Sequence, residues 1–565
     1  MTTIAITNGI VFNPFLLKFE EADIIVKDGL VLHVGDLSEF KVEREFNVKG
    51  LYVLPGFIDI HFHIESSFLL PQELAYELLR HGTLTIVADP HEVANVLGLE
   101  GVLKLIELSK NIPLTVYFQV PSCVPASEFE DTPHKLGLKE WTRLLELNEV
   151  IAVGEVMSYH KLLSGDRELL ELMRIAKEKG KIIEGHCPRL KGVELSLYAY
   201  LGPTSDHTQM TPELIFERVK RGIFVEIQEK SLTKDVIEVL NTLPIGTYAF
   251  VTDDVDPAKL VYEGHLDHII RKAVSLGLSV EKALYATTLS PANRMHLHDR
   301  GALVPGRIAD IVVVKDLYSF EVEMVFKNGN LVYSKRDGFT VKAEREYSKN
   351  IPSEFFKSVK LSKIDRRKLT IRPPISDGWV KANVIEVLPN TTFTKRVIHS
   401  IRVVDDNLLW SEAKLTLIAV FNRYGYHRHA LGFAKGSILK RGAVATTYAH
   451  DSHNLLVVGA NVDDMVLAVN HLVECQGGIV VVDKGRIVAF QSLPFAGIMS
   501  VEEASNTARN IALIREALVK LGYNHFDPLK SLTTLTLTVS PELKITPRGL
   551  FDVKEGRIIS LFVEE

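Results

Sequence analysis

The segment FIDIHFH, residues 57–63, carries the pattern that decides the fold of this chain. It is an apolar run that ends on two histidines, His61 and His63. Side chains two residues apart on a β-strand point to the same face, so both imidazoles can reach one ion. Four later segments also end on a residue able to bind a metal: VIAVGE on Glu155, KIIEGH on His186, SDH on His207 and YAFVTD on Asp253.

These strand ends converge in space only if the strands belong to one barrel or one sheet. From about Pro55 to Arg300, apolar runs of strand length alternate with segments of helical periodicity, which is typical of parallel βα units. Eight strands in about 245 residues is what a (β/α)8 TIM-like barrel requires. A doubly wound sheet is the alternative, but closure brings the first and last strand ends together and is therefore favoured. The candidate strands are centred near Ile58, Ile86, Val116, Ala152, Ile182, Ser205, Val225 and Phe250.

The segments on either side of this region predict two further units. Short alternating strands and Asn/Gly/Asp turns fill residues 1–54 and return in residues 301–345, so we expect both flanks to build one small β-sandwich domain around a barrel at 55–300. A charged, proline-containing stretch at about 344–374 indicates a boundary. Residues 346–565 again mix strands and helices and predict a C-terminal α/β domain.

Composition excludes several classes of function. Hydrophobic residues make up 46% of the chain and charged residues 24%, as in an ordinary globular protein. The net charge of −6 offers no basic face for nucleic acid. Three distant cysteines argue against a disulfide framework, and neither a secretory signal nor a membrane-spanning apolar run is visible. We therefore expect a cytoplasmic protein with no nucleic-acid or membrane partner.

The ligand types predict a hydrolytic metal site. Glu155 can bridge two cations because its carboxylate has two oxygens, and His186 with His207 can supply imidazoles to the second ion. Asp253 can bind the first ion and also accept a proton from a bound water, which makes Asp253 and Glu155 the candidate catalytic residues. Imidazole and carboxylate ligands suit Zn, Fe or Mn. A bound cation lowers the pKa of water to about 7, so hydroxide becomes available at neutral pH.

Several longer motifs resemble the adenine deaminase family of the amidohydrolase superfamily. The superfamily resemblance rests on PGFIDIHFH and on GALVPGRIADIVV at 301–313. The family resemblance rests on HIESS (63–67), VADPHEVANVLG (87–98), PSCVPAS (121–127), GEVM (154–157), TDD (252–254), EGHLDH (263–268) and AHDSHN (449–454). It covers nearly the whole chain, including the C-terminal domain characteristic of this family. Many amidohydrolases bridge their metals with a modified lysine, whereas Glu155 stands at that place here.

The resemblance implies hydrolysis of adenine to hypoxanthine and ammonia, with a metal-activated hydroxide attacking C6. It implies two divalent metal ions, for which we expect Mn²⁺ with Fe²⁺ or Zn²⁺ as alternatives. It also implies a small-molecule purine substrate and a homo-oligomer, for which we expect a dimer. One ion would be held by His61, His63 and Asp253, the other by His186 and His207, with Glu155 between them. The single-zinc deaminase class is excluded because the chain has no C-x-x-C.

Five further residues are candidate substrate contacts at the barrel mouth, each with a structural alternative. They are Glu65, Ser66, Asp89, His91 and Glu92. Glu65 and Ser66 could instead form a loop network. Asp89, His91 and Glu92 could instead form an extra metal position, or cap and favour the start of the helix that begins at EVANVLG. Far downstream, His450, Asp451 and His453 form a cluster that could be a second metal site, a lid over the barrel or a plain loop.

Two other functions compete with adenine deamination. Another amidohydrolase, cleaving a cyclic amide in the manner of a dihydropyrimidinase or hydantoinase, would typically use a bridging lysine rather than Glu155. A metal-binding scaffold without catalysis would keep the histidines but would need no carboxylate beside the water.

Overall fold

Parallel strands and helices alternate through the middle of the chain in the computed structural model, which describes residues 3–36, 40–188, 190–340 and 351–563. Each of the eight predicted strands is present. They are β6 (Phe57–Phe62), β7 (Thr83–Ala88), β8 (Thr115–Pro121), β9 (Val150–Val156), β10 (Ile182–Gly185), β11 (Ser205–Asp206), β12 (Phe224–Ile227) and β13 (Tyr248–Phe250). Every residue of β6 and β7 is buried, as expected for strands covered on both faces.

These strands form two parallel sheets that meet at both ends. One sheet has the order β10-β9-β8-β7-β6 and the other the order β11-β12-β13. At one junction, the Thr204 N–H donates to the Ile183 carbonyl at 3.0 Å. At the other junction, the Asp253 N–H donates to the His61 carbonyl at 3.0 Å, and Phe62 forms a parallel bridge with Asp253. The carboxyl ends of the first and last strands are therefore neighbours.

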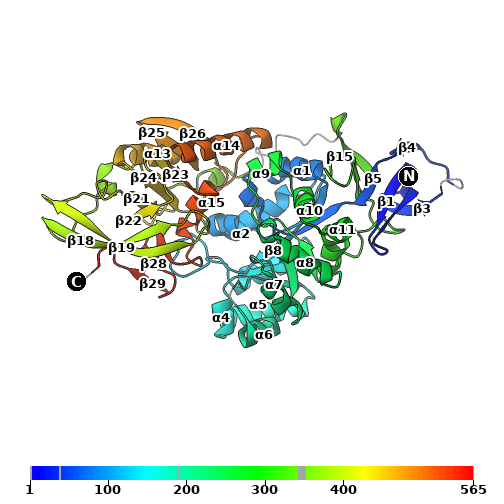
Figure 1. The fold of residues 1–565 in the computed structure, drawn as a ribbon, viewed down its shortest axis with the longest axis horizontal. Coiled ribbons are helices and arrows are strands. Elements are labelled where there is room, and N and C mark those ends of the chain that lie inside the picture. The colour runs from blue at the N-terminus through cyan, green and yellow to red at the C-terminus, as the bar shows by residue number, and fades with distance from the viewer. Residues whose placement is uncertain (1–2, 37–39, 189, 341–350, 564–565) are drawn as a thin grey trace.

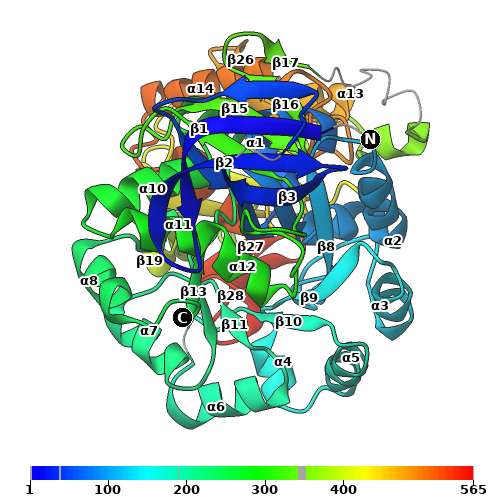
Figure 2. The same ribbon diagram turned by 90° about the vertical axis from the view of Figure 1, so that its right-hand side faces the viewer.

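Helices follow these strands and lie around their outside (Figure 2). They include α1 (Pro71–Arg80), α2 (His91–Leu108), α3 (Leu138–Leu145), α5 (Arg167–Glu178), α6 (Gly192–Leu201), α7 (Pro212–Val219), α8 (Lys234–Thr242), α10 (Leu266–Ser275), α11 (Val280–Thr287) and α12 (Leu289–Arg294). Local sequence sets where several of them begin. Thr211 and Thr233 accept hydrogen bonds from backbone N–H groups in the first turns of α7 and α8, and Pro212 stands where its missing N–H costs nothing.

The two flanks of this α/β unit lie in one nine-stranded sheet. Its order is β17-β16-β15-β14-β5-β1-β2-β3, with β4 paired to β1, and the flanks meet where β5 pairs antiparallel with β14. The strands are β1 (Thr3–Asn13), β2 (Lys18–Lys27), β3 (Leu30–Gly35), β4 (Arg44–Asn47), β5 (Tyr52–Pro55), β14 (Ile311–Val314), β15 (Val322–Lys327), β16 (Asn330–Ser334) and β17 (Gly338–Phe339).

The C-terminal part is rich in β-structure and lies at the opposite end of the molecule from that sheet (Figure 1). Its main sheet has the order β20-β19-β18-β22-β21-β24-β23-β25-β26, and a small sheet contains β27, β28 and β29. The strands are β18 (Gly378–Val387), β19 (Thr394–Val404), β20 (Asn407–Leu408), β21 (Thr416–Phe421), β22 (His429–Gly436), β23 (Ala443–Thr446), β24 (Leu455–Gly459), β25 (Gly478–Asp483), β26 (Arg486–Ser492), β27 (Leu543–Thr546), β28 (Gly549–Asp552) and β29 (Arg557–Ile559).

Three helices accompany these sheets: α13 (Val462–Cys475), α14 (Ala504–Lys520) and α15 (Pro528–Thr533). The predicted boundary at 345/346 and the start of the predicted linker at 344 lie outside the described residues. The described part of that linker, residues 351–374, holds only the short 3-10 helices η4 (Ser353–Phe356) and η5 (Arg366–Leu369).

The C-terminal part packs on the edge where the parallel strands end. Arg515 of α14 places both terminal nitrogens 2.9 Å from the carboxylate of Asp256, which follows β13. The Ser500 N–H donates to the Phe68 carbonyl at 2.7 Å, and Lys530 of α15 lies 3.3 Å from Asp254. Among the described residues, no helix is both long and apolar enough to cross a bilayer.

A buried ion pair holds the strand end that precedes His207. The Arg218 side chain of α7 is fully buried, and its Nε lies 2.8 Å from Asp206. Another of its nitrogens donates to the Cys187 carbonyl at 2.7 Å. This guanidinium therefore fixes the ends of β10 and β11 against each other.

Replacing Arg218 by methionine should strongly destabilise the fold, because Asp206 would be left buried and unpaired. We expect a loss of about 3–5 kcal/mol in the free energy of unfolding. The matched control is Arg221→Met, which removes a partly exposed pair with Glu217 and should cost about 0–1 kcal/mol. Urea unfolding followed by circular dichroism measures both. Equal midpoints for the two variants would contradict the importance of the buried pair.

Candidate metal centre

The six predicted ligands all lie at the carboxyl edge of the parallel strands. His61 belongs to β6 and His63 follows it directly, while Glu155 belongs to β9. His186, His207 and Asp253 follow β10, β11 and β13. Because parallel strands end at a common edge, residues that are almost 200 positions apart in the chain come together there.

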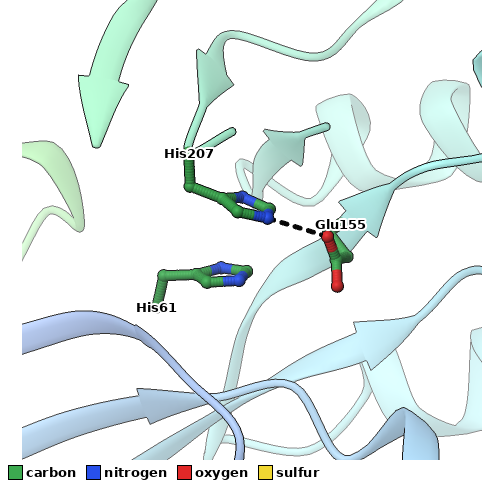
Figure 3. Close-up of side chains that lie close together, drawn as sticks. All are labelled: His61, Glu155 and His207. Atoms are coloured by element: carbon green, nitrogen blue, oxygen red, sulfur yellow. Dashed lines mark ion pairs between the residues drawn. The ribbon is translucent and has the colours of Figure 1, made fainter. Parts of the chain in front are cut away.

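Glu155 stands between two groups of histidines. Its Oε2 lies 2.7 Å from His186 Nδ1 and 2.9 Å from His207 Nε2, and its Oε1 lies 3.7 Å from His63 Nε2. The rings of His61 and His207 stack with centroids 3.7 Å apart. Figure 3 shows both rings beside Glu155, with the ion pair between His207 and Glu155 drawn as a dashed line. One carboxylate therefore contacts imidazoles on both sides.

Asp253 completes the group on the His61 and His63 side. Its Oδ1 lies 3.2 Å from His63 Nε2 and 3.7 Å from His61 Nε2. The residue has a φ of 62°, in the left-handed region that aspartate tolerates better than most residues. The neighbouring Asp254 instead places its carboxylate 3.3 Å from Lys530 of α15. Asp253, and not Asp254, is therefore the aspartate that lies beside the histidines.

The unpaired ring nitrogens test whether this cluster fits a cation. Both nitrogens of His61 and Nδ1 of His207 are buried without a hydrogen-bond partner among the described residues. Leaving such groups unpaired costs about 1–3 kcal/mol each. Ligand atoms of three groups lie within 4.8 Å of one another: His61 with Glu155 and His207, His61 with His63 and Asp253, and His63 with His91 and Glu155. Because a cation would accept these lone pairs, the donor set fits a metal centre.

Three groups of the cluster, Glu155, Asp253 and His207, favour the charge states that bind a metal. Burial alone would raise the pKa of Glu155, but the adjacent His207 and His186 hold it well below its ordinary range. Burial opposes ionisation of Asp253 too, yet the neighbouring imidazoles of His61 and His63 lower its pKa well below the usual value. Burial and the charge of His61 lower the pKa of His207. Ionised carboxylates and a neutral imidazole are the forms that bind metals.

Asp89 supports the cluster by contacting both Glu155 and His63. The alternative that its side chain caps α2 is wrong. Its Oδ2 accepts the backbone N–H of Glu155 at 3.0 Å, and its carbonyl lies 3.1 Å from His63 Nδ1, which leaves His63 Nε2 facing the cluster. The residue that caps α2 is Pro90, with no side-chain hydrogen bond. A Cβ on Gly154 would clash with the Asp89 carboxylate, so only glycine allows this approach.

Of the other predicted contact residues, Glu65 and Ser66 hold backbone groups, whereas the ring of His91 lies beside a proposed metal ligand. Glu65 is fully buried, its Oε1 accepts the Val93 N–H at 2.9 Å, and burial together with Glu92 raises its pKa to about 7. The Ser66 hydroxyl donates to the His63 carbonyl at 2.8 Å. Both therefore brace the backbone around the cluster. The ring of His91, in contrast, lies 4.8 Å from that of His63.

Glu92 contacts the C-terminal part rather than the cluster. Its Oε1 accepts the Tyr448 hydroxyl at 2.9 Å and lies 3.1 Å from His450 Nδ1. The AHDSHN segment is therefore packed against the mouth of the α/β unit and is not a remote loop.

Asp59 and Lys230 also contact the cluster or its backbone, but they were not predicted from the sequence. Asp59 accepts the N–H groups of His61 at 3.2 Å and of Thr252 at 3.2 Å, and burial raises its pKa to about 7. Alternation along FIDIHFH places Asp59 on the same face as the two histidines, and that signal could have identified it. Lys230 lies 3.7 Å from Asp253 Oδ2, and its position after β12 was the available signal.

Comparison with known proteins agrees with this geometry. The model of the amidohydrolase family matches residues 52–332, and the model of the adenine deaminase C-terminal domain matches residues 391–557. A relative named adenine deaminase, from Clostridium perfringens strain ATCC 13124, is 41% identical over 99% of both chains. The chain belongs to the adenine deaminase family. The prediction made from the motifs is thereby confirmed.

Other members of the adenine deaminase family match over the same span. A protein named adenine deaminase 2, from Shouchella clausii, is 38% identical over 99% of both chains. Among solved structures, a β-aspartyl dipeptidase from Fervidobacterium islandicum AW-1 matches with a TM-score of 0.47 and 20% identity, covering 61% of this chain and 99% of that one. As a member of the adenine deaminase family, the chain is a metal-dependent amidohydrolase.

In this adenine deaminase family member, Gly154→Ala should weaken metal binding at least tenfold. The new Cβ would displace the Asp89 carboxylate that holds the Glu155 backbone, and loss of such outer support costs about 10–100-fold in metal affinity. Gly137→Ala is the control, since a Cβ there meets only ordinary contacts. Metal content after dialysis against graded chelator, measured by mass spectrometry, compares them. Equal retention would show that Asp89 does not position Glu155.

Proposed function

We propose that this chain hydrolyses adenine to hypoxanthine and ammonia at the cluster around Glu155. The observation that carries the proposal is the position of this carboxylate, which contacts His63 on one side and both His186 and His207 on the other. A branch that cleaves cyclic amides would typically have a bridging lysine at this strand end. The full-length similarity to proteins named adenine deaminase supports adenine as the substrate.

We propose two divalent cations as cofactors, with Mn²⁺ as the native metal and Fe²⁺ or Zn²⁺ as alternatives that the same ligands accept. His61, His63 and Asp253 would hold one ion, His186 and His207 the other, and Glu155 would bind both. When bound, the cations lower the pKa of a coordinated water and so supply the nucleophile for attack at C6.

Asp253 carries the proton between water and the leaving group. Its Oδ1 faces His61 and His63, and its Oδ2 lies near Lys230, which favours the ionised form at neutral pH. This carboxylate accepts a proton from the attacking water and then gives it to the exocyclic amine, which departs as ammonia.

The candidate substrate contacts act in two ways in this proposal. His91 lies at the start of α2 with its ring beside that of His63, and it contacts the purine directly. Glu92 acts through the C-terminal part, because it holds Tyr448 and His450. Asp89, Glu65 and Ser66 act through the backbone groups that they hold.

We also propose that the two parallel sheets are two arcs of one closed (β/α)8 barrel at residues 55–300. The hydrogen bonds at the Ile183–Thr204 and His61–Asp253 junctions support closure. Residues 1–54 and 301–345 would then form the flanking β domain, and residues 346–565 the C-terminal α/β domain.

The proposal predicts ammonia release from adenine and, by chromatography, no ring opening of hydantoin or dihydrouracil. Asp253→Asn should lower kcat by about 10²–10⁴-fold, because it removes the group that moves the proton. Asp254→Asn is the matched control and should lose far less, since its carboxylate contacts Lys530 instead of the cluster. Coupled ammonia assays on the manganese-loaded proteins, with circular dichroism as the folding check, decide this. Turnover of a cyclic amide but not of adenine would overturn the proposed substrate.

A further inference from the structure

A buried group of polar side chains joins α2 to the segment at 448–453. Glu92 of α2 accepts the Tyr448 hydroxyl at 2.9 Å and lies 3.1 Å from His450 Nδ1. His453 Nε2 lies 3.9 Å from the other oxygen of the same carboxylate. These residues are separated by more than 350 positions in the chain, so the group exists only when the C-terminal part is docked.

His450 differs from its neighbours in keeping one ring nitrogen available. Its Nδ1 is held by Glu92, whereas Nε2 makes no hydrogen bond to any described residue and is not among the fully buried unpaired atoms. The residue retains 8% of its exposed area, compared with 1% for Glu92 and none for His453. A carboxylate on one nitrogen orients the ring and fixes which nitrogen faces outward. Nε2 is therefore the available nitrogen.

The ring of His450 is held against Glu92 of α2, the helix whose neighbouring His91 has its ring 4.8 Å from that of the proposed ligand His63. Its charge interacts with that of Asp254, the residue after the proposed ligand Asp253. Its neighbour Asp451 interacts with the charges of His91 and Glu155. None of the three groups of potential metal ligands contains His450. His450 thus belongs to the C-terminal part, while the metal ligands come from the strand ends.

Other acids near the cluster are less suited to donate a proton to the substrate, because they are fully buried or share a group of potential metal ligands. Glu65 is fully buried with one oxygen bound to the Val93 N–H. His453 is fully buried, and its Nδ1 accepts the Ala449 N–H at 3.2 Å. His91 shares one ligand group with His63 and Glu155.

We propose that His450 is a catalytic acid of this enzyme, donating a proton from Nε2 to the purine ring nitrogen N1 beside C6. The inference rests on the proposed adenine deamination and names the group that completes it. As oxygen attacks C6, the electron pair of the C6–N1 double bond moves onto N1. A proton on N1 favours this step, because N1 then ends neutral instead of negatively charged. Glu92 and Tyr448 are positioning residues that hold the ring.

The protons balance over one turnover. Water forms the new C–O bond at C6 and gives one proton through Asp253 to the amine, which leaves as ammonia when the C–N bond breaks. His450 gives its Nε2 proton to N1, and that proton remains on hypoxanthine. The second water proton leaves the C6 hydroxyl as the carbonyl forms and restores His450.

The surroundings of His450 favour its protonated form. Burial lowers its pKa, but the charges of Glu92, Asp254 and Asp451 outweigh burial and raise the pKa above the ordinary histidine value. Tyr448 and His453 also face the ring. The protonated form is lost as the pH rises through this raised pKa, so kcat should fall on the alkaline side.

The test is His450→Gln in the full-length, manganese-loaded enzyme. We expect kcat on adenine to fall about 10²–10⁴-fold with KM changed less than threefold, and the alkaline limb of the kcat profile to disappear. His450→Ala should be partly rescued by added imidazole, which a purely structural histidine would not allow. His525→Gln is the control, a buried histidine of the same part whose Nε2 lies 3.0 Å from the Thr391 carbonyl. It should keep the wild-type profile.

Three outcomes separate the two proposals. If the wild-type enzyme does not release ammonia from adenine, the proposed function is overturned, and the role of His450 falls with it. If wild-type is active and His450→Gln keeps both its kcat and its alkaline limb, the assignment of His450 is overturned. Loss of the limb in His91→Gln instead of His450→Gln would transfer the role to His91. Equal metal content and melting temperature in all variants establish that folding is not the cause.

Discussion

The buried carboxylate of Glu155 is the interaction on which the rest of this structure depends. It is a charge removed from water, and its ionised form is sustained by His207 and His186 on one side. An ionised group in such a place needs cations or hydrogen-bond donors on every side. The strand-end geometry meets that need, because it delivers imidazoles from β6, β10 and β11 to a carboxylate on β9.

Support for this carboxylate extends outward through the fold. Asp89 holds its backbone, Gly154 leaves room for Asp89, and the buried Arg218 fixes the strand end that precedes His207. The C-terminal part then covers the same edge through contacts to Asp254, Asp256 and Glu92. The cluster is thus assembled from residues that no single segment could position, and the C-terminal part packs directly on the edge that carries it.

Local spacing predicted much of this arrangement. His61 and His63 are two residues apart on a strand, and each later ligand ends an apolar run, so both the strands and the ligands were visible in the sequence. The role of Asp89 was not predictable, because helix capping is equally compatible with its position before α2. The partners of Glu92 could not be predicted either, since Tyr448 and His450 reach it only through long-range packing that leaves no periodic signal.

The central claim is that Glu155 is shared by two cations. Crystals of the manganese-loaded enzyme, measured at the manganese absorption edge, test it most directly. The account predicts two anomalous peaks, one beside His61, His63 and Asp253 and the other beside His186 and His207, each with a Glu155 oxygen in its coordination sphere. A single peak, or two peaks of which one has no Glu155 oxygen in its coordination sphere, would contradict it.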